Sequence, residues 1–104
     1  MTFNKDNWLA GLKKAVQDLK AQPTAGLPCA VAVCRHIRDA MLEEVSEDDK
    51  AIVNDFFNGE DGFIRAIANA EAKGDLCGFA CNASAAAKAA KIESATKSAV
   101  DILD

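Results

Sequence analysis

The chain has 104 residues, and its 12 basic and 16 acidic side chains give a formal net charge of −4. Proteins that bind nucleic acid contact phosphates through clustered Lys and Arg, so this balance argues against nucleic acid as a partner. It argues equally against binding to an anionic membrane surface. No apolar stretch is long enough for a transmembrane helix, and the N-terminal residues lack the apolar region of a signal peptide. We therefore expect a single soluble, cytoplasmic domain spanning residues 1–104.

Apolar residues recur at helical spacing along the chain, which predicts an all-α, compact bundle of about five helices. The first helix is expected over residues 3–22. Asn4 suits its N-cap position. Phe3 and Trp8 flank this cap at the two positions of a hydrophobic staple, in which an apolar residue before the cap packs on one in the first turn.

Three further helices follow the Pro-flanked loop that ends at Pro28. The second is expected to begin at Pro28, because proline is favoured in a first helical turn. Ser46 suits the N-cap of the third helix, since three acidic residues follow it where the helix dipole favours negative charge. A turn over residues 58–62 leads to a short fourth helix, which Gly74 is expected to end.

The last helix is expected to begin at Asp75 and to run to about Leu103. Nine alanines lie between Ala80 and Ala99, and small side chains permit close helix packing. We expect this helix to mediate self-association as a homodimer or larger oligomer, because a small core gains by burying more surface. Steps of three and four residues predict one packing face, formed by Ile92, Ala95, Ala99 and Ile102.

A set of large apolar residues on these helix faces is predicted to form the core. Each of them lies at the spacing of one helical stripe. They are Trp8, Leu12, Val16, Val33, Ile37, Met41, Phe56 and Ile67.

The four cysteines form two local pairs, Cys29 with Cys34 and Cys77 with Cys81. Cys29 and Cys77 are expected in first helical turns, where unpaired N–H groups stabilise a thiolate. One hypothesis is that all four bind zinc or another soft metal, or perform thiol redox chemistry. However, their spacing is not that of the strongest zinc signatures. Alternatively, Cys34 and Cys81 are small buried hydrophobic residues, or the cysteines form structural disulfides.

His36, the single histidine, could add a fifth ligand or act as a base for a cysteine, or it could simply face solvent. Between Glu43 and Asp61 the sequence has eight acids and one base. Glu43, Glu44 and Glu47 resemble the acidic run of magnesium-dependent all-α nucleotide pyrophosphohydrolases. The resemblance implies a metal-assisted hydrolase, but it covers five residues and no second Glu-x-x-Asp pair follows. The alternative is a docking face for a basic protein surface.

The sequence lacks a Gly-rich phosphate loop, a serine nucleophile motif and a dinucleotide fingerprint. We therefore expect a small acidic helical binding module that self-associates and is not an enzyme, with no cofactor. The first alternative is a metal-binding or redox protein that uses the two cysteine pairs. The second is a small metal-dependent hydrolase with an acidic site.

Overall fold

The computed structural model describes residues 3–21, 29–73 and 84–103, and the regular secondary structure in these ranges is entirely helical. The all-α prediction is therefore confirmed for this part of the chain. The predicted helix boundaries at Gly74 and Asp75 lie outside the described residues. In the ranges searched, no helix has the length and apolarity needed to cross a bilayer. The helices are α1 (Lys5–Ala21), α2 (Ala30–Glu44), α3 (Glu47–Asn58), α4 (Phe63–Ala72) and α5 (Ala85–Leu103).

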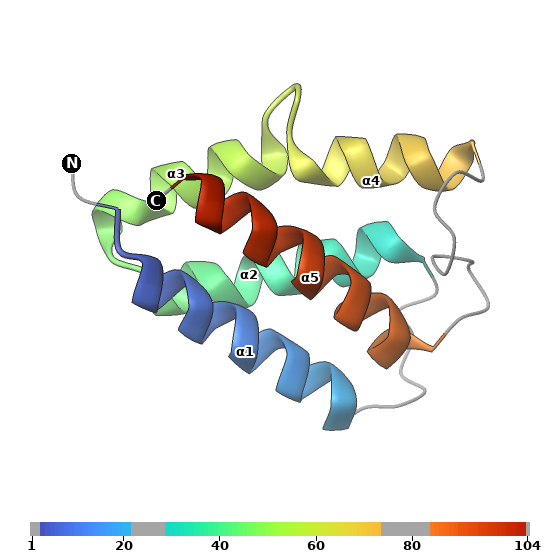
Figure 1. Cartoon of the computed structure of the whole chain (residues 1–104), viewed down its shortest axis with the longest axis horizontal. Helices are drawn as coiled ribbons and strands as arrows, with labels where there is room; N and C mark the ends of the chain where they lie inside the picture. Colours follow the sequence, from blue (N-terminus) through green and yellow to red (C-terminus); the bar gives the residue numbers. More distant parts are fainter. Residues whose placement is uncertain (1–2, 22–28, 74–83, 104) are drawn as a thin grey trace.

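Over the described ranges, the five helices pack as four rows, because α3 and α4 run end to end (Figure 1). Together they run antiparallel to α2. Arg38 in the middle of α2 bonds to Asn58 at the end of α3. The backbone N–H of Ala30, at the start of α2, donates to the Glu71 carboxylate near the end of α4 (2.8 Å). The pair of helices thus covers the whole length of α2.

The start of α1 has the predicted cap and staple. The side chain of Asn4 accepts a hydrogen bond from the backbone N–H of Asn7 (3.1 Å). The rings of Phe3 and Trp8 pack edge to face, with their centroids 5.1 Å apart. Both interactions are local in sequence, which is why the sequence alone predicted them.

The start of α3 is capped as predicted and is also tied to α1. The Ser46 side chain accepts a hydrogen bond from the backbone N–H of Asp49 (3.4 Å). Asp49 is fully buried, and its Oδ2 accepts a hydrogen bond from the backbone N–H of Asn4 (3.0 Å). A carboxylate of α3 therefore satisfies a backbone donor at the start of α1.

The predicted core is confirmed with one correction. Seven of the eight predicted residues are buried, but Phe56 is only partly buried, and the adjacent Phe57 is fully buried instead. Successive residues of a helix point about 100° apart, so both rings cannot face the core equally. Phe56 covers the core from outside, packing edge to face on Trp8 and stacking on Phe63.

The predicted packing face of α5 is wrong in its second half. Ala95 is exposed and Ile102 is 84% exposed. After Ile92 the buried stripe advances in steps of four, so polar Thr96 takes the inward position that was assigned to Ala95. The buried residues of α5 are Ala85, Lys88, Ala89, Ile92, Thr96 and Val100.

Helix α2 lies at the centre of the bundle and contacts each of the other four helices. It approaches α1 closely at Gly11, which is buried. A Cβ atom placed on Gly11 would lie only 2.6 Å from the Cα atom of Met41 and 3.0 Å from its Cγ. The backbone of Met41 occupies the space that any larger side chain at position 11 would need.

We predict that Gly11→Ala lowers the free energy of unfolding by about 1–3 kcal/mol, the usual cost of overpacking a core. Helix propensity alone predicts the opposite sign, because alanine stabilises an exposed helix position over glycine by about 1 kcal/mol. Urea denaturation measures the difference. The exposed substitution Ser94→Ala on α5 is the control and should change stability little. A more stable Gly11→Ala protein would contradict the close contact between α1 and α2.

Candidate functional site

Only one of the two cysteine pairs lies in the described structure. Cys29 is the N-cap residue of α2, not a residue of its first turn, because the chain is still extended there (φ −133°) and the helix begins at Ala30. Cys34 lies on the inner face of α2 and is fully buried. Cys77 and Cys81 are outside the described residues, so the four-cysteine metal or redox site stays a prediction.

The environment of Cys34 favours the neutral thiol. Burial raises the pKa of Cys34 to about 12, although the positive charges of Arg38 and Arg35 act in the opposite direction. A thiol with this pKa is protonated at neutral pH and is a poor nucleophile. Cys34 therefore has the properties of a small hydrophobic core residue.

The pKa of Cys34 predicts how stability depends on pH. The folded protein holds this proton up to about pH 12, whereas the thiol of an unfolded chain has a pKa near 9.0. The stabilisation is therefore complete below pH 9 and is lost as the pH rises toward 12, by at most about 1.4 kcal/mol per pH unit. Under reducing conditions, wild type should lose stability between pH 9 and 11 more steeply than Cys34→Ala. Parallel curves for the two proteins would contradict this account.

The acidic segment is partly neutralised by neighbouring lysines. Lys14 of α1 forms ion pairs with Glu43 (2.6 Å) and Glu44 (3.4 Å), and Lys50 pairs with Glu47 (2.8 Å). The hydrogen bond and charge of Lys14 lower the pKa of Glu43. In the part of the chain that the structure describes, no three His, Cys, Asp or Glu side chains form a group able to hold a metal ion.

His36 is half-buried on α2 rather than fully exposed to solvent. Its Nε2 atom is buried and has no hydrogen-bond partner among the described residues. The structure thus does not join His36 to Cys29 or Cys34 through a hydrogen bond, and the proposed roles of ligand and base remain predictions.

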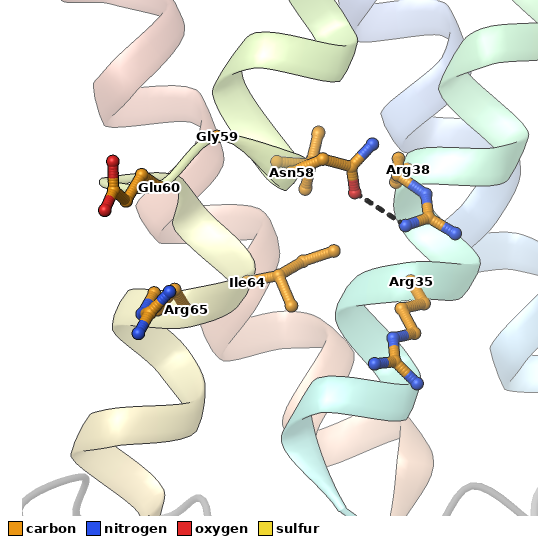
Figure 2. A pocket seen from close by; sticks show the side chains of 8 residues that line it. Arg35, Arg38, Asn58, Gly59, Glu60, Ile64 and Arg65 are labelled. Atoms are coloured by element: carbon orange, nitrogen blue, oxygen red, sulfur yellow. Dashed lines mark hydrogen bonds between the residues drawn. The ribbon is translucent and has the colours of Figure 1, made fainter.

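All three arginines of the chain line one hollow beside the turn that joins α3 to α4. Arg35 and Arg38 project from successive turns of α2, and Arg65 comes from the first turn of α4. Figure 2 shows Ile64 between Arg65 on one side and Arg35 and Arg38 on the other. We call this site the arginine hollow; its volume is about 260 Å³, and it is lined by Arg35, Arg38, Phe57, Asn58, Gly59, Glu60, Ile64 and Arg65.

The three guanidinium groups differ in how firmly they are held. Arg38 is largely buried and donates from Nε to Asp39 Oδ1 (2.9 Å) and from Nη1 to Asn58 Oδ1 (2.7 Å). Its Nη2 atom forms an ion pair with the same Asp39 oxygen (2.9 Å). These bonds fix Arg38 between α2 and the end of α3 (Figure 2). Arg35 and Arg65 are exposed and have neither a hydrogen bond nor an ion pair with any described residue. Two arginines are therefore available to a ligand beside one that is pre-positioned.

The turn between α3 and α4 places Arg65 opposite the arginines of α2. A Cβ atom on Gly59 would lie 2.7 Å from the carbonyl oxygen of Asp55, and one on Gly62 would lie 2.7 Å from the backbone of Gly59. Only glycine fits this tight turn at both positions. The same turn places the half-buried Ile64 in the lining as its apolar part.

Sequence reasoning missed the arginine hollow. The available signal was that the chain has only three arginines and that two of them, Arg35 and Arg38, are three residues apart on one predicted helix. Residues at that spacing share a helix face. The third arginine is 27 positions after Arg38, so its place beside them depends on how α4 packs against α2.

Another hollow, of about 390 Å³, lies between α1 and α5 and is lined by Leu9, Leu12, Lys13, Glu93 and Lys97. Two of its charged groups already neutralise each other, because Lys97 pairs with Glu93 (3.1 Å). The arginine hollow, with the unpaired Arg35 and Arg65, therefore offers more unpaired charge than this hollow does.

No protein-family model matches the chain, and comparisons with curated proteins and with solved structures find no match. The functional interpretation accordingly depends on the chemistry of the arginine hollow.

Proposed function

We propose that this protein is a non-catalytic helical binding module whose ligand is an organic anion held in the arginine hollow. The observation that carries the proposal is that all three arginines of an acidic chain line one hollow. Arginine presents a planar fork of N–H donors that matches carboxylate and phosphate oxygens, whereas lysine is a point charge. The nine lysines of the chain are absent from this lining.

The charge of the lining supports the same proposal. Three arginines and one glutamate, Glu60, give the lining a formal charge of +2, which the ion pair of Arg38 with Asp39 lowers to +1, against −4 for the whole chain. Like charges placed around one small volume repel each other unless a counter-charge is present. A bound anion would remove this repulsion and would also satisfy the donors of Arg35 and Arg65.

We predict that Arg35→Gln and Arg65→Gln each weaken the binding of phenyl phosphate and benzoate by about tenfold or more, the range expected for losing one charge-assisted hydrogen bond. Isothermal titration calorimetry measures the dissociation constants. Lys20→Gln removes the same charge from an exposed site outside the hollow and should leave binding unchanged.

Two results would overturn the proposed function. One is that neither anion binds to the wild-type protein. The other is that Lys20→Gln weakens binding as much as the two arginine variants, because the anion would then respond only to the net charge of the protein.

Self-association through α5 is a second candidate function, favoured by the exposed apolar end of this helix. Ile102 is 84% exposed and Leu103 is 47% exposed. We predict that Ile102→Asn and Ala90→Glu reduce the oligomer mass measured by sedimentation velocity at high micromolar concentration. A wild-type protein that is strictly monomeric under these conditions would contradict the prediction.

A further inference from the structure

We propose that the ligand of the arginine hollow is a small organic phosphate monoester. Its phosphate group would lie among the three guanidinium groups, and its organic part would pack on Ile64. This inference rests on the proposed function, because it names the class of anion that the hollow selects.

The directions from which the arginines approach favour a tetrahedral anion. Arg35 and Arg38 reach the hollow from α2, and Arg65 belongs to α4, across Ile64 (Figure 2). A carboxylate has two oxygens, and its acceptor positions lie close to one plane. A phosphate monoester has three terminal oxygens pointing in different directions and can accept from donors on several sides. A phosphate can therefore accept hydrogen bonds from more of the guanidinium groups on α2 and α4 than a carboxylate can.

The donor groups of Arg38 point to a pre-positioned anchor. Its Nε donates to Asp39, its Nη2 is ion-paired with the same carboxylate, and its Nη1 donates to Asn58. A guanidinium carries more N–H donors than these partners accept, so Arg38 keeps donors for a ligand while its position is fixed. Asn58 is itself held, because its Nδ2 donates to Asn54 (3.1 Å). The fixed arginine reduces the entropy that is lost when the ligand binds.

The charge of the hollow favours an anion. Three arginines and Glu60 give the lining a formal charge of +2, and the ion pair between Arg38 and Asp39 lowers it to +1. A phosphate monoester carries about −1.5 to −2 at pH 7, so it is attracted to this charge more strongly than a carboxylate or sulfonate with a single charge. Glu60 also disfavours a ligand that carries a second separate anionic group near the turn.

The size and lining of the hollow limit the organic part. Its volume of about 260 Å³ lies below the usual range of small-molecule pockets, roughly 300–1,000 Å³. Ile64, which is half-buried, provides apolar surface next to the arginines. A small apolar group on the phosphate suits this space, whereas a dinucleotide would exceed it.

Four probes test the proposal by calorimetric titration of the full chain: phenyl phosphate, inorganic phosphate, benzenesulfonate and benzoate. Phenyl phosphate should bind at least about tenfold more tightly than benzenesulfonate, which is tetrahedral with one charge, and than benzoate, which is planar with one charge. It should also bind more tightly than inorganic phosphate, which lacks an apolar part. Arg35→Lys keeps the charge and removes the fork, so it should weaken phenyl phosphate binding by about tenfold.

The outcomes separate this inference from the proposed function. Benzoate or benzenesulfonate could bind as tightly as phenyl phosphate, with Arg35→Gln weakening the binding of that ligand and of phenyl phosphate alike. In that case the assignment of a phosphate monoester is wrong, but the proposed anion-binding function stands. If none of the four probes binds, both proposals fail. Inorganic phosphate binding as tightly as phenyl phosphate would overturn the role of Ile64. Full affinity in Arg35→Lys would overturn the role of the guanidinium fork. Circular dichroism melting curves confirm that each variant is folded. Arg38 is not substituted, because its hydrogen bond to Asn58 also joins α2 to α3.

Discussion

Burial of the inner face of α2 is the constraint on which the rest of the structure depends. This helix contacts each of the other four helices, and its inner residues, Cys34 and Met41 among them, are fully buried. The backbone of Met41 lies so close to α1 that position 11 has room only for glycine. Once this face is enclosed, the adjacent stripe of α2 that carries Arg35 and Arg38 must lie beside α3 and α4. The packing of the core thus determines where two of the three arginines are placed.

The turn between α3 and α4 determines where the third one lies. Gly59 and Gly62 allow the chain to turn so tightly that α4 continues along α2 rather than leaving it. At the far end, Glu71 of α4 accepts the first N–H of α2 (2.8 Å), where a helix dipole favours a carboxylate. Asn58 bonds to Arg38 at the near end (2.7 Å). The contacts that close the bundle therefore also bring Arg65 beside the arginines of α2, and fold and site share the same interactions.

The features that the sequence predicted correctly depend on neighbouring residues, and those that it missed depend on packing. The caps at Asn4 and Ser46 involve residues only three positions apart, so local pattern was sufficient. The sequence predicted Phe56 and Ala95 as inward-facing, but Phe57 and Thr96 are buried instead. The spacing of apolar residues predicts a helix, but it does not determine which of two adjacent residues faces the neighbouring helices. The capping of Ala30 by Glu71 and the meeting of Arg38 with Arg65 link separate helices and could not be inferred from spacing.

The central claim is that the three arginines form one ligand site, and NMR of their side chains tests it most directly. With only three arginines in the chain, a spectrum of the Nε–Hε groups contains three arginine signals, which single substitutions assign. On titration with phenyl phosphate, the account predicts that the signals of Arg35, Arg38 and Arg65 shift together and saturate with one dissociation constant. Arginine signals that stay unchanged on titration would contradict this claim. So would three arginine signals that shift with unrelated dissociation constants.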